Sequence, residues 1–578
     1  MKYFNELLFL LSVAERKRAV LLLVIILIMA LLEVIGVASV LPFVAVLTNP
    51  DLVETNSFLN IMFKFSYIFG VNNIQDFILA LGFFLLITLT FSLTFKAFTT
   101  YAYIRFIHMR EYTISKRLIE AYFHQPYSWF LSHHSADLGK NILSEVRQVI
   151  ESGMRPFFEL VAKSIVIIFL VILLILVDPS FALIVSLSFI IAYVLIFYLA
   201  RNYLKRFGQE RLKSDQLRFT TISEAFGAIK EIKVSGLEKN YIKNFVNCSK
   251  IFVRVHILSK VLGLLPRYII EIIAFGGILY FILYTISQTG NFNNILPILS
   301  LYIFAGYRLM PAIQEVYNSF TQLAYIKPSL NKLHNDLKTL EINDKNIDQE
   351  VLKFNKTISL KNISYNYPNS SRTTLKDINF TITINSKVGF FGPTGSGKTT
   401  IVDIILGLLE PKSGTLEVDG KVITKQNTRS WQLSIGYVPQ HIYLSDDTVA
   451  ANIAFGVDPE YIDLDIVKRV SQVAYLHNFV SKELPNQYQT KIGERGVRLS
   501  GGQRQRIGIA RALYKKPKIL ILDEATNALD DQTEKFVLDD INNFYKDVTI
   551  ILISHRLNII ENCDMILKFD KNQVVRVK

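Results

Sequence analysis

Six stretches of this chain are apolar over the length that a helix needs to cross a lipid bilayer. About 20 consecutive, mostly apolar residues are enough for one crossing. The six stretches lie at 19–47, 77–104, 157–177, 181–200, 268–288 and 293–312. They predict a six-helix transmembrane domain over residues 1–325. The alternative, buried helices in the core of a large soluble protein, fits poorly with a chain that is 51% hydrophobic and only 19% charged.

Lysine and arginine are unevenly distributed among the segments that connect these stretches. Segment 201–260 holds thirteen of them and segment 105–155 holds seven, whereas segment 48–76 holds only Lys64. Because basic loops stay on the cytoplasmic side of a membrane, we expect the N-terminus, both basic segments and everything after the sixth stretch to be cytoplasmic. Basic loops that face anionic lipid also account for the net charge of +14, so we expect no nucleic-acid partner.

From about residue 351 the composition changes to that of an α/β domain, which we expect over 351–578 after a charged linker over 326–350. A short apolar strand, 388–391, runs into a glycine-rich loop of the form G-x-x-x-x-G-K-[ST], and a helical pattern follows. The residues are Gly392, Pro393, Thr394, Gly395, Ser396, Gly397, Lys398, Thr399 and Thr400. Such a loop binds phosphate through backbone N–H groups and a helix N-terminus. We therefore expect ATP here, with Lys398 on the β- and γ-phosphates and Thr399 on Mg²⁺.

Four polar residues follow further apolar strands of this domain. Asp523 and Glu524 end one strand; we expect Asp523 to hold Mg²⁺ and Glu524 to act as the general base toward the attacking water. A helix cap is the alternative for this acidic pair. His555 follows another strand and is expected to contact the γ-phosphate, and Gln440 follows a third and is expected to sense water and Mg²⁺.

Two other segments are expected to contact ATP. Residues Leu499–Gln503 read L-S-G-G-Q, a phosphate-contacting motif whose members are Ser500, Gly501, Gly502 and Gln503. Tyr367, which precedes Pro368, is expected to stack on adenine, although Tyr365 competes for this role.

In their order along the chain, these motifs resemble those of ATP-binding cassette transporters of the exporter type. The matching segments are Gly392–Thr399, Gln440, Gly493–Gly496, Leu499–Gln503, Ile519–Glu524, Asn527–Asp530 and His555. Asn527 stands where serine is usual, and we expect little effect from it. The resemblance implies ATP hydrolysis coupled to transport. It also implies a dimer, because Ser500–Gly502 of one subunit would close over ATP on the phosphate loop of its partner. We expect a homodimer, and a heterodimer is the alternative.

Three segments outside the ATPase domain carry further expectations. The two basic segments are expected to be helical extensions of the membrane helices. Each is expected to end in a short coupling helix that touches the ATPase domain, around Ser132–Lys140 and Ser214–Ser223. Plain surface loops are the alternative. Segment 57–69 has polar positions that leave one apolar face at helical spacing. We expect it to lie in the outer membrane interface as an amphipathic helix, or else to pack as a loop on the helix ends.

Three basic residues, Lys96, Arg267 and Arg308, lie within or at the edge of the apolar stretches. A charge at mid-bilayer costs roughly 2.5–3.5 kcal/mol on insertion scales and is tolerated where it lines a wet cavity. A cationic lining would suit a phosphate or pyrophosphate headgroup. The alternative is that these residues snorkel from helix ends or pair with the carboxylates of Glu33, Glu271 or Glu315.

Short segments of the apolar stretches are similar to bacterial flippases of lipid-linked oligosaccharides, namely 32–43, 266–268 and 307–312. Segment 57–69 also resembles an external helix of that group. The similarity implies transport of a polyprenyl-pyrophosphate-linked oligosaccharide to the outer leaflet of a bacterial cytoplasmic membrane. Glu315 stands where that group can carry a further arginine, so the headgroup contacts stay open. The alternatives are an exporter of another lipid, a peptide or a drug-like molecule, and a non-transporting ATPase.

Overall fold

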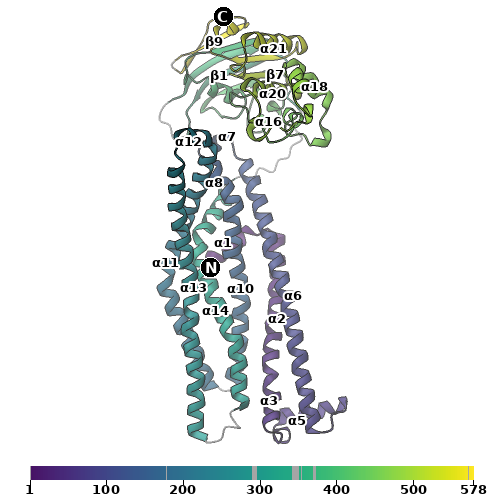
Figure 1. Ribbon diagram of the computed structural model, residues 1–578, viewed down its shortest axis with the longest axis vertical. Coiled ribbons are helices and arrows are strands. Elements are labelled where there is room, and N and C mark those ends of the chain that lie inside the picture. The colour runs from purple at the N-terminus through teal and green to yellow at the C-terminus, as the bar shows by residue number, and fades with distance from the viewer. Residues whose placement is uncertain are drawn as a thin grey trace. The chain divides into compact units, whose positions relative to one another are not determined.

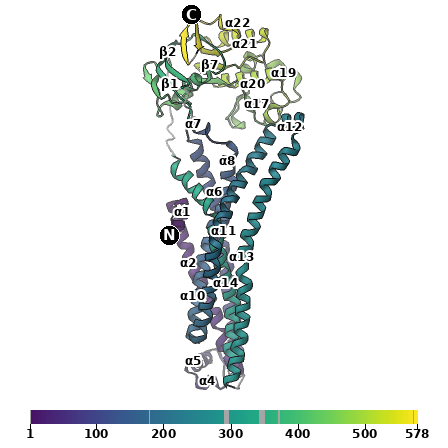
Figure 2. The same cartoon turned by 90° about the vertical axis from the view of Figure 1, so that its left-hand side faces the viewer.

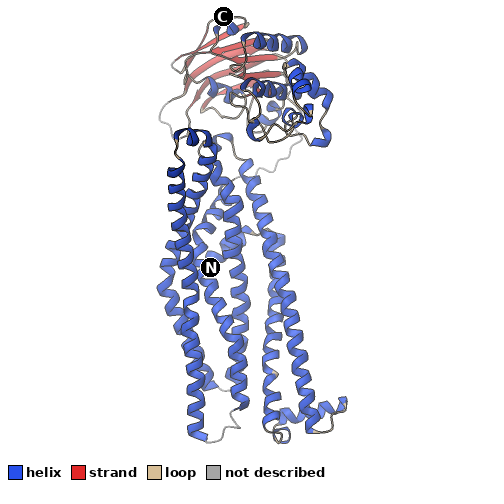
Figure 3. Ribbon diagram, viewed as in Figure 1, coloured by secondary structure: helices blue, strands red, loops and turns tan. Residues whose placement is uncertain are grey.

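The chain folds into two compact units in the computed structural model, which describes residues 2–177, 179–289, 296–340, 351–352, 354–368, 373–570 and 572–578 (Figure 1). The first unit comprises Met1–Gln125 and His133–Asn343, and the second comprises Pro126–Ser132 and Asp344–Lys578. Figure 3 shows that the first unit is built of helices and that the second combines sheets with helices, as expected from the sequence.

The first unit contains the long helices. Its first part holds α1 (Lys2–Leu10), α2 (Val13–Ala38), α3 (Val40–Thr48), α4 (Leu52–Thr55), α5 (Ser57–Ser66), η1 (Tyr67–Phe69) and α6 (Ile74–Phe123). Its second part holds α8 (Ser135–Lys140), η2 (Asn141–Glu145), α9 (Val146–Val149), η3 (Ile150–Met154), α10 (Arg155–Val177), α11 (Pro179–Gly227), α12 (Ile229–Ser235), α13 (Glu238–Thr289) and α14 (Leu296–Thr339).

Four helical segments among the described residues are long and apolar enough to cross a membrane. They are Val13–Thr48, Ile74–Phe123, Ser135–Val177 and Ser186–Gly227, and they contain the first four expected stretches almost entirely. The fifth and sixth expected stretches fall on α13 and α14, with 293–295 outside the described residues, as is Asp178 of the expected turn. Helix α14 continues to Thr339. The beginning of the expected linker is therefore helical, and its residues 341–350 lie outside the described ranges.

The long helices pack closely through small residues. Helices α2, α10 and α14 share an apolar cluster that includes Ala30, Leu170 and Ala305. Helices α11 and α14 approach each other so closely at Gly208 that a Cβ there would lie 2.0 Å from the carbonyl oxygen of Tyr325. Figure 2 shows α11 and α13 running side by side. On α6, by contrast, many large apolar side chains are exposed, among them Leu79, Phe83, Leu86 and Ile87, as a lipid-facing surface requires.

Segment 57–69 is helical, as expected, and forms α5 followed by the 3-10 turn η1. The Asn56 side chain caps the N-terminus of α5 by accepting hydrogen bonds from the backbone of Phe58 and Leu59. Leu59 is buried in an apolar cluster with Phe77 of α6, whereas Phe58, Ile61 and Phe65 are exposed. The position of this helix in the outer membrane interface stays a prediction.

The short helices of the two basic segments differ from the expected coupling helices. Residues Ser214–Ser223 are part of the continuous helix α11, and the next short helix is α12, which ends where Gly236 adopts a left-handed conformation with φ 64°. In the other segment, Pro126 separates α6 from the short helix α7 (Tyr127–Phe130), because the residue before a proline is disfavoured in a helix. Helix α7 belongs to the second unit, whereas α8 belongs to the first.

The second unit contains two sheets. An antiparallel sheet has the order β2-β1-β4-β5, formed by β1 (Thr357–Tyr365), β2 (Leu375–Thr383), β4 (Ser413–Val418) and β5 (Lys421–Val422). The other sheet has the order β10-β9-β3-β8-β7-β6 and is parallel except for β10. Its strands are β3 (Lys387–Phe391), β6 (Ile435–Val438), β7 (Ile519–Asp523), β8 (Thr549–Ile553), β9 (Met565–Asp570) and β10 (Gln573–Arg576).

Helices and single helical turns connect these strands. The α-helices are α15 (Lys398–Ile405), α16 (Thr428–Gln432), α17 (Val449–Ile453), α18 (Leu464–Val473), α19 (His477–Glu483), α20 (Gly501–Tyr514), α21 (Asp531–Phe544) and α22 (Leu557–Ile560). The 3-10 turns are η4 (Pro459–Tyr461), η5 (Gln487–Gln489) and η6 (Glu494–Gly496).

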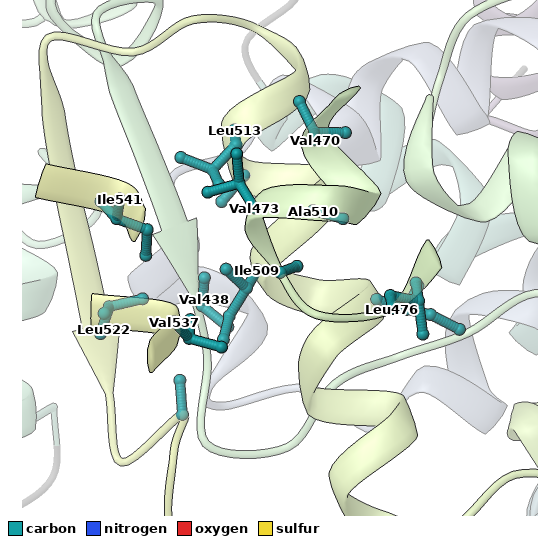
Figure 4. Close-up of a cluster of buried hydrophobic side chains, with 14 of the residues drawn as sticks. Val438, Val470, Val473, Leu476, Ile509, Ala510, Leu513, Leu522, Val537 and Ile541 are labelled. Carbon is teal, nitrogen blue, oxygen red and sulfur yellow. The ribbon is translucent and has the colours of Figure 1, made fainter. Parts of the chain in front are cut away.

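Strand β7 is buried on both faces, which explains why its sequence is continuously apolar. Leu520 and Leu522 face one hydrophobic cluster, which also contains Val438 and Ile509 (Figure 4). Ile519 and Ile521 face the cluster on the opposite side of the sheet. Two cores therefore hold the strand in place, and its carboxyl end carries the acidic pair that begins at Asp523.

Candidate active site

The phosphate loop connects β3 to α15 and has the backbone conformation that its glycines allow. Gly392, Gly395 and Gly397 have φ values of 151°, 80° and 99°, which favour glycine. A Cβ at Gly392 would lie 2.3 Å from the carbonyl oxygen of Phe569, and one at Gly397 would lie 2.7 Å from Leu375 Cδ2. Helix α15 begins at Lys398 without a side-chain cap. The loop therefore offers backbone N–H groups to an anion, as a phosphate group requires.

Two side chains of the loop fit a phosphate ligand. Lys398 is buried, and its Nζ donates hydrogen bonds to the carbonyl oxygens of Gly392 at 2.7 Å and Pro393 at 3.0 Å. Burial lowers the pKa of Lys398, although Glu524 and Asp523 oppose this effect. The buried Oγ of Ser396 has no hydrogen-bond partner in the described part of the chain. A bound phosphate would supply acceptors to both groups.

The carboxylates near the loop fit a magnesium ion that is also held by phosphate. Asp523 is 5% exposed, and burial raises its pKa, with a further contribution from the charge of Glu524. The hydroxyl of Tyr437 lies 3.5 Å from Asp523 Oδ2. No cluster of three or more His, Cys, Asp or Glu side chains suited to a metal occurs among the described residues. Mg²⁺ commonly takes only one or two protein carboxylates and completes its shell with phosphate and water.

Glu524 is in contact with both of the other residues predicted to be catalytic. Gln440 Nε2 donates to Glu524 Oε2 at 2.8 Å, and His555 Nε2 lies 2.9 Å from Glu524 Oε1. Asn527 Nδ2 also donates to Oε2, at 3.1 Å. Because β6, β7 and β8 are neighbours in the parallel sheet, the residues that follow these strands meet at one edge.

The structure distinguishes between the two tyrosines considered for adenine stacking. Tyr365 is 5% exposed, and its ring meets that of Tyr367 edge-on with centroids 5.2 Å apart. Tyr367 is only half-buried, and its hydroxyl lies 3.0 Å from Thr400 Oγ1. Tyr367 is therefore the tyrosine that a base can reach, and its role in stacking stays a prediction.

The L-S-G-G-Q segment forms the N-terminus of α20. Ser500 Oγ accepts from the backbone N–H of Gln503 at 3.2 Å, and Gln503 Oε1 accepts from the backbone N–H of Ser500 at 2.8 Å. This reciprocal capping fixes the start of the helix. The expected contact of this segment with ATP on a second subunit stays a prediction.

Four polar residues around the site were given no role by the sequence motifs. Asp403 lies on α15, and burial together with the charge of Asp523 raises its pKa to about 6. Gln505 of α20 accepts from Ala528 N at 2.9 Å. Tyr437 and Arg556 each lie within three residues of a motif position, Gln440 and His555. Proximity in sequence was the signal for these two, whereas nothing in the sequence singled out Asp403 or Gln505.

The three basic residues expected to bind a headgroup form ion pairs in the first unit. Lys96 Nζ lies 2.5 Å and Arg308 Nη1 lies 3.3 Å from the same oxygen, Oε1 of Glu33. Arg267 pairs with Glu271 one turn further along α13 at 2.8 Å and is 61% exposed. The structure thus shows the alternative interpretation, in which these basic residues pair with carboxylates, here those of Glu33 and Glu271. A headgroup role for these residues stays a proposal.

Glu315 lies instead in a cavity of about 290 Å³ between α2, α6, α10 and α14. The polar side chains that line this cavity are those of Lys96, Thr99, Thr100, Tyr103, Arg155, Glu159, Lys163 and Glu315. Lys163 was not selected from the sequence, although a lysine within the apolar stretch 157–177 was a visible signal.

A phosphate-loop ATPase unit in one chain with a bundle of membrane-length helices defines a class, the ATP-driven membrane transport proteins. The sequence matches two family descriptions, "ABC transporter" over residues 375–527 and "ABC transporter transmembrane region" over residues 19–307. The chain therefore belongs to the ABC transporter family, with a transmembrane domain fused to an ATP-binding domain that hydrolyses ATP to drive transport.

Three similar proteins illustrate the relationship. The "ATP-dependent lipid A-core flippase" of Cupriavidus pinatubonensis is 30% identical over 79% of this chain and 77% of its own length. The "Multidrug resistance ABC transporter ATP-binding and permease protein" of Lactococcus lactis is 33% identical over 64% of this chain and 62% of its own length, which is less than two thirds of that relative. A bacterial Atm1-family ABC exporter with ATP bound has the same fold, with a TM-score of 0.76, 21% identity and coverage of 97% of this chain and 94% of that one.

Proposed function

We propose that this transporter moves a lipid-linked glycan with a phosphate or pyrophosphate headgroup from the cytoplasmic to the outer leaflet of a bacterial cytoplasmic membrane. The observation that carries the proposal is the charged cavity in the helical unit. Its lining combines the cations of Lys96, Arg155 and Lys163 with the carboxylates of Glu159 and Glu315. Charges in a membrane domain are costly unless they face water, a partner or a ligand.

The cations of the cavity differ in how well they are neutralised. Arg155 Nε lies 3.0 Å from Glu159 Oε1, and Lys96 is paired with Glu33. Within the described residues, no carboxylate lies within ion-pair distance of Lys163. Lys163 is therefore the cation with most to gain from an anionic ligand, and Lys96 is close enough to the same cavity to assist.

The acceptors of the cavity suit hydroxyl groups of a sugar. Glu159 Oε1 already accepts from the hydroxyl of Tyr103 at 3.2 Å, and Glu315 lines the same space. A phosphate next to hydroxylated sugar rings would satisfy both kinds of lining group. Similarity to relatives named lipid A-core flippases supports a lipid cargo.

The proposed roles in the ATPase unit follow from the site. Mg²⁺–ATP, when bound, supplies the phosphoanhydride bond whose hydrolysis drives the cycle. Lys398 and the loop N–H groups bind its phosphates, Asp523 and Thr399 hold Mg²⁺, and Glu524 accepts the proton of the attacking water. Replacement of Glu524 by Gln is expected to preserve ATP binding and to reduce turnover by at least about a hundredfold, since general bases contribute about that much.

The proposal is tested by translocation in proteoliposomes. Purified protein, a tritiated polyprenyl-pyrophosphate-linked oligosaccharide, and ATP are expected to give translocation that Glu524→Gln abolishes. Lys163→Ala is expected to reduce translocation by about tenfold while basal ATP hydrolysis stays near normal. Lys250→Ala, which removes an exposed lysine of α13, serves as the matched control. Robust ATP hydrolysis without movement of this lipid would overturn the proposal.

Export of a drug-like molecule is the second candidate. The cavity is also lined by Ile26, Met29 and Phe158, and one relative is named a multidrug resistance transporter. An apolar cargo would contact this side and would depend little on Lys163. ATP-dependent uptake of a lipophilic dye into inverted vesicles, unchanged in Lys163→Ala, would favour this candidate.

A further inference from the structure

The two oxygens of the Glu524 carboxylate have unequal surroundings. Oε2 accepts from Gln440 Nε2 at 2.8 Å and from Asn527 Nδ2 at 3.1 Å, whereas Oε1 contacts only His555 Nε2, at 2.9 Å, among the described residues. Each carboxylate oxygen has two lone pairs. Both lone pairs of Oε2 are therefore used, and Oε1 keeps one for a further donor.

Asn527 makes its contact from a turn that is fixed on several sides. Glu524 begins the turn in a left-handed conformation with φ 49°, and Asn527 N donates to the Glu524 carbonyl oxygen at 3.3 Å. Gln505 donates to this same oxygen at 3.4 Å and accepts from Ala528 N. Arg556 donates to the Asn527 carbonyl oxygen at 3.4 Å. The amide of Asn527 thus reaches Glu524 from a backbone that is held at both ends of the turn.

We propose that Asn527 is a positioning residue for ATP hydrolysis, which acts by fixing the rotation of the Glu524 carboxylate. Together with Gln440 it holds Oε2, so that Oε1 is the oxygen presented to the attacking water. A carboxylate restrained in this way spends less time in orientations that cannot accept the proton. The shorter side chain of serine, the residue usual at this position, does not carry an amide donor. The inference rests on the proposed role of Glu524 as the general base.

The test is a double-mutant cycle in the full-length protein, measured as single-turnover hydrolysis of radiolabelled ATP. Asn527→Ala is expected to lower the hydrolysis rate by about tenfold and to change the ATP concentration at half-maximal rate by less than about twofold. In a Glu524→Gln background the same substitution is expected to have no further effect, because the two residues act as one unit. Asn527→Gln, which keeps an amide, is expected to restore part of the rate.

Controls separate positioning from a general effect on the fold. Asn527 is exposed, so its replacement leaves no cavity, and melting temperatures are expected to stay unchanged. Asn543→Ala removes an exposed asparagine of α21 and is expected to leave hydrolysis unchanged.

Three outcomes would overturn the inference. The first is a normal rate in Asn527→Ala, and the second is an equal loss with and without Glu524. Normal turnover in Glu524→Gln itself would remove the general-base role and this inference with it. If the double-mutant cycle gives the expected rates but the lipid is not translocated, the result counts only against the proposed cargo.

Discussion

At the scale of single residues, the ATPase site concentrates negative charge in a buried space. Burial raises the pKa of both Asp403 on α15 and Asp523 at the end of β7, and the charge of Asp523 raises the pKa of Asp403 further. Lys398 is the buried cation near this pair. The folded ATPase unit therefore carries carboxylates that would be more stable in water, a cost that bound Mg²⁺ would offset.

A prediction for pH dependence follows from Asp403, whose folded-state pKa is raised to about 6 from 3.8. A raised pKa means that the folded chain binds this proton more tightly than the unfolded chain. The stabilising contribution is thus present below pH 4 and is lost as the pH rises through about 6. Asp403→Asn is expected to increase the free energy of unfolding by about 1–2 kcal/mol at pH 8 and by about half as much at pH 5, which lies midway between the two pKa values.

Thermal unfolding in detergent without nucleotide, monitored at both pH values, checks this prediction. Asp446→Asn, which replaces an exposed aspartate, is the matched control and is expected to show no difference between the two pH values. Equal stabilisation by Asp403→Asn at pH 5 and pH 8 would contradict the argument.

The meeting of Gln440, Glu524 and His555 could be predicted because each follows an apolar strand, and carboxyl ends of parallel strands share one edge of a sheet. The contact from Asn527 could not be predicted, because it depends on the left-handed backbone of Glu524. The ion pairs of Lys96 and Arg308 with Glu33 were expected only as the alternative to a headgroup role, since they bring together residues of three helices at a register that only packing determines.

At the scale of elements, proline and glycine determine where several helices end, and small residues determine how closely two helices pack. The long helices were predictable from apolar length alone. The positions of α7 and α12 were not, because a proline and a glycine define them rather than any apolar pattern. The expectation that Ser214–Ser223 forms a separate coupling helix was wrong, since this polar sequence has no residue that ends a helix.

Packing of α11 against α14 is expected to depend on Gly208. A Cβ at this position would lie 2.0 Å from Tyr325 O, which forces a shift, and 3.3 Å from Pro328 Cδ, which is a tight contact. Gly208→Ala is expected to destabilise the helical unit by about 1–3 kcal/mol, the usual cost of overpacking. Gly227→Ala in the same helix meets no atom within 4 Å and is the control. Thermal unfolding in detergent measures both, and equal melting temperatures would contradict the prediction.

At the scale of the whole molecule, one chain carries one phosphate loop and one L-S-G-G-Q segment. Within the described residues, Ser500 and Gln503 bond to each other's backbone. The two units could be predicted, because the order of the motifs indicates the ATPase unit and the length of the apolar stretches indicates the membrane helices. The assembly rests on resemblance alone, since a single chain contains no information on contacts between copies.

A complementation experiment tests the expected homodimer. Chains with Lys398→Ala and chains with Ser500→Arg are expected to be inactive alone, because each homodimer would have two defective sites. Heterodimers isolated with two affinity tags would have one intact site, formed by Lys398 of one chain and Ser500 of the other. They are expected to recover up to about half of the normal ATP hydrolysis rate. Heterodimers as inactive as the parent homodimers would contradict the shared site.

The length of α11 has a mechanical consequence. Pro179–Gly227 is one unbroken helix of 49 residues, which at 1.5 Å per residue is roughly 70 Å long. It contains no proline after its first residue, whereas its neighbour α13 contains Pro266. A rod of this length works as a lever: a tilt of about 5° at one end displaces the other by about 6 Å. Angular changes too small to disturb local packing can thus become displacements as large as a side chain.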